Sequence, residues 1–218
     1  GWKMAAVLQG WGGADLLDSY ENERRPIGLR NTGESHRMAL IVSGTRIPDR
    51  VEEDSPEGEA VRAELGDYLQ ETLPELFAAV GIQLGARYDG SPLISRENEK
   101  DDPPPDDAAG SAPSACPGGR APHFWLEGGE ALYDHLGEGF TLLRFGNNTD
   151  ASDLENAAAA RGVPLKILDI DNPAGRRLYE RDLALVRPDQ YVAWRGDAPP
   201  ADPGGLIGRL TGAVTGAA

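Results

Sequence analysis

The segment 113–126 contains three prolines and a pair of adjacent glycines, and it ends in a short apolar run. Proline inside a helix removes a backbone hydrogen bond and clashes with the preceding turn, so no regular helix can cross this segment. The residues at its end, Phe124, Trp125 and Leu126, are too apolar to be left in solvent. We therefore expect an extended strap that crosses between two structural bodies and inserts its aromatic end into the second.

The composition limits what the chain can bind. A formal net charge of −15 argues against a nucleic-acid partner or an anionic membrane surface, because both require a basic face. No apolar run approaches the roughly 18–20 residues of a membrane-spanning helix. Cys116 is the single cysteine, which excludes an internal disulfide and is typical of a reducing cytoplasm. We expect a soluble cytoplasmic protein of 218 residues, with one large domain or two small ones.

The chain begins in the middle of a helical pattern. Residues 2–8 already have the apolar periodicity of a helix, and no N-cap residue precedes them. Apolar and polar residues alternate over 82–94, up to a turn signal at Asp89-Gly90, which predicts a half-buried strand or hairpin. A lone strand has marginal stability and requires a sheet, for which nothing upstream supplies a partner. Both features predict that the chain was processed or is a piece of a longer protein.

Helical patterns dominate the rest of residues 1–95. Asp15 is a suitable N-cap, and Pro26 is expected to kink or break the helix that contains it. Glu21 and Arg25 have the i,i+4 spacing of a surface ion pair. The helices predicted by these patterns are 1–9, 16–25, 29–42, 56–70 and 74–80.

Residues 96–112 have the composition of a linker. Three consecutive prolines stand between clusters of acidic side chains in this segment. Such a composition buries too little apolar surface to fold and favours an extended, polyproline-like chain. We expect a solvated, mobile linker here.

Residues 113–218 alternate between strand and helix patterns. Their order, β-α-β-α-β-β-α, predicts a parallel pair joined by a crossover helix, then an antiparallel hairpin and a closing helix. Ser152 and Glu155 have the spacing of a capping box that opens the crossover helix. The predicted strands are 140–145, 163–170, 183–186 and 191–194, and the predicted helices are 152–162, 173–179 and 206–210.

This order resembles a thioredoxin-like domain. That family places a Cys-x-x-Cys motif after the first strand, where this sequence reads Gly-Asn-Asn-Thr over 146–149. Cys116 lies outside the predicted domain and has no second cysteine to pair with. We therefore interpret residues 113–218 as a redox-silent scaffold with an N-terminal strap.

Four stretches resemble class A FAD-dependent monooxygenases, the aromatic hydroxylases of the para-hydroxybenzoate and phenol hydroxylase type. Gly-Trp-Lys-Met-Ala-Ala-Val-Leu at 1–8 is similar to the helix that follows this family's second flavin-binding motif, and 17–26 is similar to its next helix. Residues 81–92 and Pro-Gly-Gly-Arg-Ala-Pro-His at 117–123 resemble the branch with a thioredoxin-like C-terminal domain. That branch includes phenol hydroxylases and polyketide-tailoring hydroxylases.

The resemblance implies a fold class that combines α+β and α/β. The C-terminal part of an FAD- and substrate-binding domain would occupy 1–95, the linker 96–112, and the thioredoxin-like domain 113–218. The implied cofactor is FAD, with NAD(P)H as co-substrate and O₂ as the oxygen source. The implied reaction is hydroxylation of a small aromatic or polyketide-like substrate, by a protein that could form a homodimer.

The same resemblance shows which family motifs this sequence lacks. It has neither the Gly-x-Gly-x-x-Gly motif that binds the ADP part of FAD nor the Gly-Asp motif that holds the ribityl chain. The glycines at 10–13 end a helix instead of opening one after a strand, so they do not substitute. We expect the chain to be a C-terminal portion that is inactive alone and contributes no catalytic, flavin-binding or metal-binding residue.

Two residues are candidates for the wall of a substrate cavity. Arg87 and Tyr88 lie on the predicted strand over 82–94 and could face an aromatic substrate in the complete enzyme. Tyr88 also fits the core face of that strand. These two residues are the only substrate contacts that we predict.

Other polar residues favour structural roles. The three histidines share no metal-type spacing, and His123 is expected to hydrogen-bond the strap to a neighbouring domain. Asp169 and Asp171 follow a strand, but with no phosphate-binding loop in the chain they are expected to form a strand-end turn. The charged residues of the second helix are expected to form an ion-pair network on its surface: Glu21, Glu23, Arg24 and Arg25.

Two alternatives remain open at this point. The chain could be a complete binding or dimerisation module built on its thioredoxin-like half. It could also be a redox-active relative of thioredoxin, against which the absence of Cys-x-x-Cys speaks.

Overall fold

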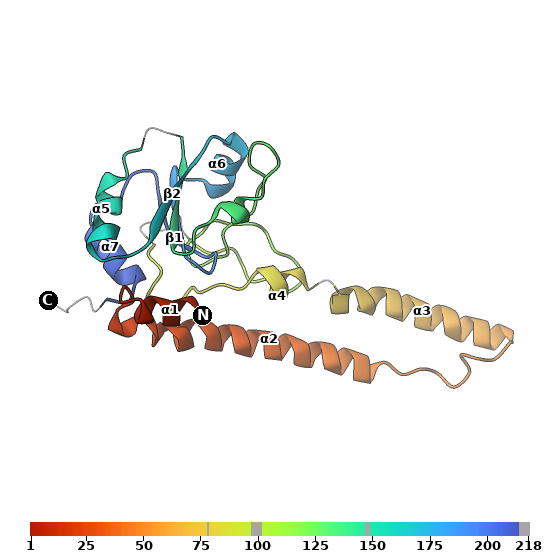
Figure 1. The fold of residues 1–218 in the computed structure, drawn as a ribbon. Coiled ribbons are helices and arrows are strands. Elements are labelled where there is room, and N and C mark those ends of the chain that lie inside the picture. The colour runs from red at the N-terminus through yellow and green to blue at the C-terminus, as the bar shows by residue number, and fades with distance from the viewer. Residues whose placement is uncertain (78, 97–101, 147–148, 214–218) are drawn as a thin grey trace. The chain divides into compact units, whose positions relative to one another are not determined.

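In the computed structural model, the chain divides into two compact units (Figure 1). The structure describes residues 1–77, 79–96, 102–146 and 149–213. The sheet unit comprises Gly1–Arg25, Ala86–Pro105 and Ala112–Ala218. The helical unit comprises Pro26–Gly85 and Asp106–Ser111.

A four-stranded sheet forms the centre of the sheet unit. Its strands are β1 (Phe140–Phe145), β2 (Leu165–Ile170), β3 (Leu183–Val186) and β4 (Val192–Gly196), in the spatial order β2-β1-β3-β4. β1 and β2 are parallel, whereas β1–β3 and β3–β4 are antiparallel. The predicted order and strand directions are therefore confirmed, as is the mixed α/β fold of this half.

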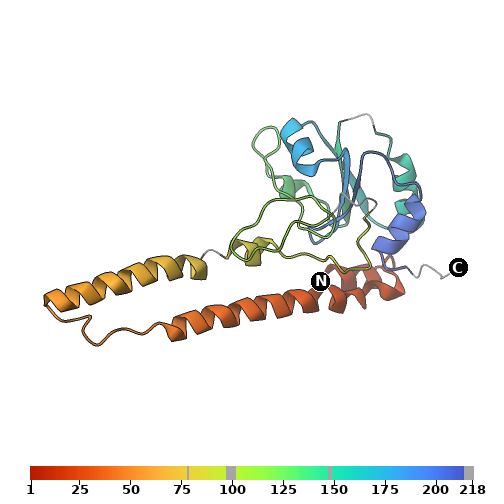
Figure 2. The same cartoon turned by 180° about the vertical axis from the view of Figure 1, so that it is seen from behind.

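Helices cover both faces of this sheet. α5 (Ser152–Ala160) and α7 (Pro203–Leu210) lie on one side, and α6 (Pro173–Tyr179) lies on the other (Figures 1 and 2). Because side chains alternate across a strand, Phe140 and Leu142 face the opposite side of the sheet from Leu143 and Phe145. Both faces of β1 are therefore apolar, as expected for a strand with helices on either side.

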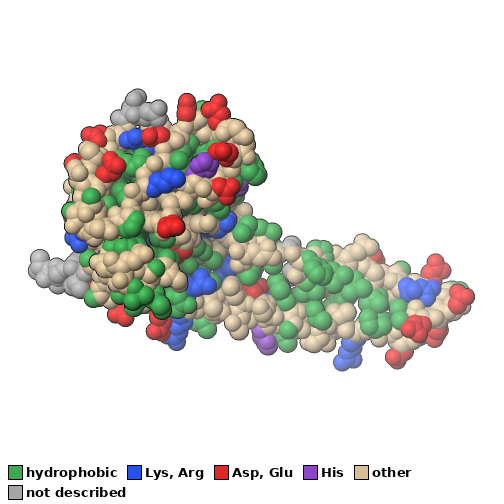
Figure 3. Space-filling model, viewed as in Figure 1, with side chains coloured by type: hydrophobic (Ala, Val, Ile, Leu, Met, Phe, Trp, Pro, Cys, Tyr) green, Lys and Arg blue, Asp and Glu red, His purple; other side chains and the backbone are tan. Residues whose placement is uncertain are grey.

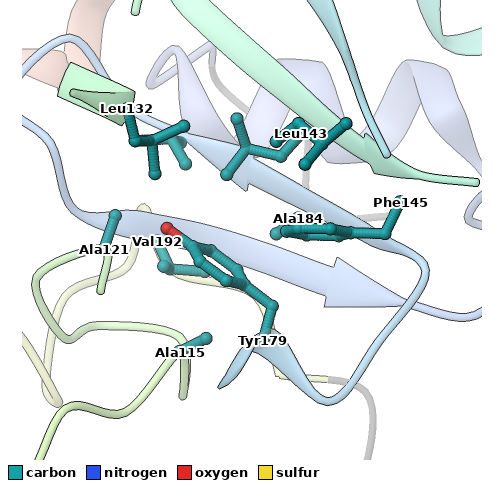
Figure 4. Packing of buried hydrophobic residues seen from close by; sticks show 10 residues of the cluster. Ala115, Ala121, Leu132, Leu143, Phe145, Tyr179, Ala184 and Val192 are labelled. Carbon is teal, nitrogen blue, oxygen red and sulfur yellow. The ribbon is translucent and has the colours of Figure 1, made fainter. Parts of the chain in front are cut away.

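The core on the α6 side is built around Tyr179. Its ring lies 5.0 Å from that of Phe145, and its hydroxyl donates a 2.9 Å hydrogen bond to the carbonyl of Pro122 in the strap (Figure 4). Burying side chains of this size contributes about 1.5–3 kcal/mol each. The buried members of this cluster are Ala115, Ala121, Leu132, Leu143, Phe145, Ile170, Tyr179, Ala184, Val186 and Val192.

The strap over 113–126 is extended, as predicted, but it lies wholly within the sheet unit. The amide of Gly118 donates to the carbonyl of Val192, and Arg120 forms a bridge with Tyr191, so the strap runs beside β4. Its aromatic end is only partly inserted: Phe124 packs against the core, whereas Trp125 is 64% exposed. The expectation that Trp125 is buried was wrong, because the strap's side chains alternate between the core and solvent.

The capping box predicted for α5 is not formed. The N-cap is Ala151, and the Asp150 carboxylate accepts a 2.9 Å hydrogen bond from the amide of Ser152. An acidic residue just ahead of the helix satisfies a free amide as well as the predicted serine would. Residues 147–148, within the position where a redox motif would stand, lie outside the described residues.

Helices α1 (Trp2–Leu8), η1 (Ala14–Leu16) and α2 (Ser19–Gly44) begin the chain. α1 confirms the first predicted helix. Asp15 lies inside η1 instead of capping a helix. The predicted break at Pro26 was wrong, because α2 continues through it. A proline removes one backbone hydrogen bond, and the bonds on either side are enough to carry this helix across it.

In the helical unit, the remainder of α2 is followed by α3 (Pro56–Phe77) and α4 (Val80–Leu84). The predicted strand or hairpin over 82–94 was wrong: its start belongs to α4 and the rest is turns and irregular backbone. Alternation alone does not make a strand unless a second strand offers backbone partners, and none in the described ranges pairs with this segment. Instead the amide of Ile82 donates to the carbonyl of Ala108.

Part of the predicted linker is fixed. Asp106 forms an ion pair with Arg30 of α2, with Nη2–Oδ1 at 2.5 Å, so residues 106–111 belong to the helical unit and are not a free linker. The ion pair between Asp106 and Arg30 and the hydrogen bond from Ile82 of α4 to Ala108 hold this segment in place, although its composition is typical of a linker. Residues 97–101, in the same predicted linker, lie outside the described residues.

The helical unit exposes much of its apolar surface (Figure 3). Among its described residues, Ile27 is the one buried hydrophobic side chain. None of the described helices is both long and apolar enough to cross a membrane. Large exposed side chains of this unit include Leu29, Leu40, Val42, Leu73 and Phe77.

Candidate functional site

Four charged side chains meet in the sheet unit, three of them buried and the fourth, Asp189, half-buried, and we call them the charge cluster. Lys3 comes from α1, Glu23 from α2, and Arg187 and Asp189 from the turn between β3 and β4. The turn is closed by a hydrogen bond from the amide of Arg187 to the carbonyl of Tyr191 at 2.8 Å. A short hairpin turn of this kind fixes the direction in which its side chains leave the sheet.

Arg187 and Glu23 form the centre of the charge cluster. Nη1 and Nη2 of Arg187 donate to the two carboxylate oxygens of Glu23 at 2.6 and 2.9 Å, a bidentate pair. Nε and Nη2 of the same guanidinium donate to Asp189 at 3.0 and 2.8 Å. The Arg187 side chain is 0% exposed and that of Glu23 is 2% exposed. Charge-assisted bidentate pairs are the strong hydrogen bonds of proteins, and here water does not screen them.

Further donors complete the shell around Glu23. Nζ of Lys3 lies 2.6 Å from Oε2 of Glu23 and also donates to the hydroxyl of Ser19 at 2.6 Å. The Ser91 hydroxyl donates to Oε1 of Glu23 at 2.7 Å. Three separate parts of the chain therefore converge on one carboxylate.

Aromatic rings enclose the cluster. The indole nitrogen of Trp2 donates to Asp189 at 3.0 Å, and the Arg187 guanidinium lies over the rings of Trp2 and Tyr88 at 5.2 and 5.1 Å. The ring of Tyr88 stacks on that of Tyr191 at 4.1 Å. Stacking on aromatic faces suits the planar, weakly hydrated guanidinium of arginine.

Sequence reasoning missed the charge cluster. Glu23 was assigned to an ion-pair network on the helix surface, but it is buried, and that part of the prediction was wrong. The Glu21–Arg25 pair does lie on the exposed surface, as predicted. One signal was available: Ser19, Glu23 and Ile27 share a helical face at i,i+4 spacing, and all three are buried. Because two of them are polar, the apolar periodicity did not reveal that face.

The two predicted substrate residues have structural partners. Tyr88 is 5% exposed, and its hydroxyl accepts a 3.0 Å hydrogen bond from Arg24. Arg87 pairs with Asp89 at 3.0 Å and donates to the carbonyl of Pro117. A role for Arg87 or Tyr88 toward substrate stays a prediction.

The remaining candidates are dispersed. His135 faces Glu130 at 2.8 Å, and the ring of His123 packs against that of Trp125. Asp169 is paired with Arg144 at 2.5 Å. In the ranges that the structure describes, no group of three or more His, Cys, Asp or Glu side chains is arranged so that it could hold a metal ion.

The environment of the cluster favours the charged forms of Glu23 and Arg187. Burial raises the pKa of Glu23. The hydrogen bonds and positive charge of Arg187, together with hydrogen bonds from Lys3 and Ser91, lower it by more than burial raises it, so the net pKa is below the ordinary 4.5. Burial lowers the pKa of Lys3, and Glu23 opposes this. Burial also lowers the pKa of Arg187, but the carboxylates of Glu23 and Asp189 outweigh it, so the net pKa is raised. Glu23 and Arg187 therefore form a fixed ionic junction between α2 and the turn after β3.

Glu23→Gln is expected to destabilise the chain at neutral pH, and to do so progressively less as the pH falls below 4.5. Because folding lowers the pKa of Glu23, its carboxylate contributes stability that is present above 4.5 and lost as pH falls through the folded-state value. Urea unfolding of both proteins across this pH range measures the difference.

The matched control is Glu21→Gln on the same helix, where an exposed ion pair contributes little. It should leave the stability nearly unchanged at every pH. A Glu23→Gln difference that grows on acidification would contradict the assignment.

Comparison with known proteins identifies both ends of the chain. Residues 114–217 match the family model for the C-terminal domain of aromatic-ring hydroxylases, and residues 1–35 match that of an FAD binding domain. The charge cluster thus joins side chains from both matched regions.

Individual relatives of this chain are FAD-dependent or phenol monooxygenases, in agreement with the two family matches. The chain is 31% identical over 208 residues to an FAD-dependent monooxygenase of Penicillium oxalicum, covering 90% of this chain and 39% of that protein. It is 30% identical to phenol 2-monooxygenase of a Pseudomonas species, covering 93% of this chain and 38% of that protein. It therefore spans about two fifths of the length of these curated relatives.

A solved flavin enzyme has a similar fold, in agreement with the family matches. The rebeccamycin biosynthetic enzyme RebC, solved with reduced flavin, superposes with a TM-score of 0.89 at 39% identity, covering 98% of this chain and 40% of that one. The match extends through both units and includes the mixed four-stranded sheet. These comparisons identify residues 114–217 as the C-terminal domain of an aromatic-ring hydroxylase and residues 1–35 as part of an FAD binding domain, and the chain as a whole is similar to FAD-dependent monooxygenases.

Proposed function

We propose that this chain forms the C-terminal portion of an FAD-dependent monooxygenase that hydroxylates an aromatic or polyketide-like substrate with NAD(P)H and O₂. One observation carries the proposal: a match to the FAD domain and a match to the ring-hydroxylase C-terminal domain occur in this order within one chain. The protein would act in the cytoplasm, where NAD(P)H is available.

The names of relatives support the substrate class. Similar proteins include aklavinone 12-hydroxylase of Streptomyces purpurascens, 33% identical, and a putative polyketide hydroxylase of Streptomyces halstedii, 31% identical. The flavin-dependent monooxygenase PieE, solved with FAD and substrate, has a TM-score of 0.79 at 27% identity. A planar aromatic substrate is the chemistry that these names suggest, and Arg87 and Tyr88 remain our proposed contacts to it.

We expect that the residues of this chain do not form a flavin site by themselves. A site for the FAD diphosphate needs backbone amides at a glycine-rich turn or a free cation. Lys3 and Arg187 are the buried cations of the charge cluster, and both form ion pairs with Glu23. FAD supplies the oxygen-transfer chemistry when it is bound. This chain contributes α1 and the start of α2, which fold in the same compact unit as its C-terminal domain.

The 218-residue chain is expected to retain no flavin after incubation with FAD and gel filtration, and to oxidise no NAD(P)H. The native protein, captured from its source cells with an antibody against residues 113–218, is expected to carry flavin. It should also oxidise NAD(P)H faster when an aromatic substrate is added. Flavin absorbance and oxygen uptake are the measurements.

Two results would contradict the proposal. The first is a native species at 23.2 kDa, the mass of this chain, that contains no flavin. The second is a yellow 218-residue chain as purified, which would show that the residues present are sufficient for flavin binding.

A second candidate is a non-catalytic binding or dimerisation module. The exposed apolar side chains of the helical unit favour it, since a surface of this kind usually meets a partner. A flavin-free native protein of the mass of this chain, eluting as a homodimer, would support this alternative over the monooxygenase.

A further inference from the structure

The two family matches are separated in sequence, but most of the first lies in the same compact unit as the second. The FAD-domain match ends at residue 35 and the C-terminal match begins at residue 114. Yet Gly1–Arg25 and Ala112–Ala218 belong to one compact unit. Three independent sets of contacts join them.

The first set is the charge cluster. The turn between β3 and β4 extends Arg187 to Glu23 of α2 and Asp189 to Trp2 of α1. The two side chains that face each other across this contact, Arg187 and Glu23, are among the most deeply buried of the chain. Removing either one would leave the other charge buried with an incomplete shell.

The second set joins backbone to backbone. The amide of Gly13 donates to the carbonyl of Thr211 at 2.8 Å, and the amide of Asp15 donates to the carbonyl of Gly212 at 3.0 Å. Gly212 has φ +65°, and a Cβ on Gly13 would lie 2.3 Å from the Gly212 oxygen. The end of α7 and the turn after α1 therefore approach at a distance that only glycine allows.

The third set is aromatic. The rings of Trp2 and Trp11 stack with centroids 6.2 Å apart, and both form T-shaped pairs with Phe140 at the start of β1, at 6.0 and 6.3 Å. Phe140 is 1% exposed. Aromatic pairs in these geometries add stability beyond the area they bury.

We propose that the C-terminal domain is a clamp that holds α1 and the start of α2 in their folded arrangement. A helix as short as α1 does not persist in water without tertiary contacts. The domain matched at 114–217 supplies these contacts to Trp2 of α1, to Glu23 of α2 and to Gly13 and Asp15 in the turn that follows α1. A thioredoxin-like domain without its redox motif thus has a mechanical role, because it fixes the helices that belong to the FAD-domain match. This inference does not depend on flavin, substrate or catalysis.

Native-state hydrogen exchange of the 218-residue chain tests the clamp. In the wild type, amides of α1 are expected to exchange through the same opening as those of β1, with the same dependence on denaturant. In Glu23→Gln and in Arg187→Met, amides of α1 should exchange about 100-fold faster or more. Amides of β2, which lies away from the cluster in the sheet order, should be accelerated only by the loss of global stability, at least about ten-fold less than those of α1.

The controls are Glu21→Gln and Arg177→Met, charged residues of the same types outside the cluster, which should change neither region. The proposal is overturned if α1 in the wild type exchanges without protection or with a smaller denaturant dependence than β1. It is equally overturned if a cluster variant accelerates β2 as much as α1. If the variants do not fold, the wild-type comparison of α1 with β1 decides the question by itself.

Discussion

Arg187→Met is expected to lower the free energy of unfolding by about 3–5 kcal/mol, the cost of breaking a buried ion pair by removing one partner. Methionine fills most of the volume of the arginine stem but leaves the Glu23 carboxylate, 2% exposed, with donors from Lys3 and Ser91 alone. Asp189 loses its guanidinium partner as well. Urea unfolding followed by circular dichroism measures the change.

A double-mutant cycle separates the pair from its surroundings. Combining Arg187→Met with Glu23→Gln should cost clearly less than the sum of the two single changes, because neither charge is then left buried without its counterpart. Arg177→Met, outside the cluster, should stay within about 0.5 kcal/mol of the wild type. Strict additivity of the two cluster variants would show that Glu23 and Arg187 do not stabilise each other.

Gly13→Ala is expected to destabilise the chain by about 2–4 kcal/mol. The added Cβ would lie 2.3 Å from the carbonyl oxygen of Gly212 and 2.4 Å from Cα of Ala213, so backbone must move. That movement weakens the hydrogen bonds from Gly13 to Thr211 and from Asp15 to Gly212, each contributing about 0.5–1.5 kcal/mol. Thermal unfolding of the two proteins under identical conditions gives the difference.

Gly66→Ala in α3 is the matched control. A Cβ at Gly66 meets no atom within 4 Å, and alanine is favoured over glycine by about 1 kcal/mol inside a helix. This change should therefore leave stability unaltered or raise it. Equal tolerance of alanine at Gly13 and at Gly66 would show that the contact between the first turn and the end of α7 does not constrain the fold.

The sheet half shows how far local pattern can lead. β1, β2, β3 and β4 lie within a few residues of their predicted positions, because each is a short apolar run bounded by glycine, proline or polar residues. The crossover through α5 follows from the spacing between the first two strands, since parallel neighbours need a connection of that length. The family resemblance found in 1–8, 17–26 and 117–123 is likewise confirmed, because these stretches lie within the two family matches.

The errors in the first half share a cause. Alternation over 82–94 was interpreted as a strand, but the segment has no strand to pair with in the described ranges, and its first residues form α4. Pro26 was expected to break a helix whose remaining hydrogen bonds carry it to Gly44. Asp106 was placed in a free linker, although it pairs with Arg30 of α2. In each case, contacts with residues outside the segment decided a conformation that differs from the one its local sequence prefers.

By itself, the sequence determined the element order of the sheet unit, the absence of a Cys-x-x-Cys motif and the family. These depend on residue types and spacings within short stretches. Only the tertiary structure decided that Glu23 is a buried ionic centre, that Gly13 is a point of close backbone approach, and that residues 1–25 fold with the C-terminal domain. The physical reason is that burial of a charge, or closure of two backbones, depends on partners such as Arg187 and Gly212 that lie far along the chain and leave no periodic signal.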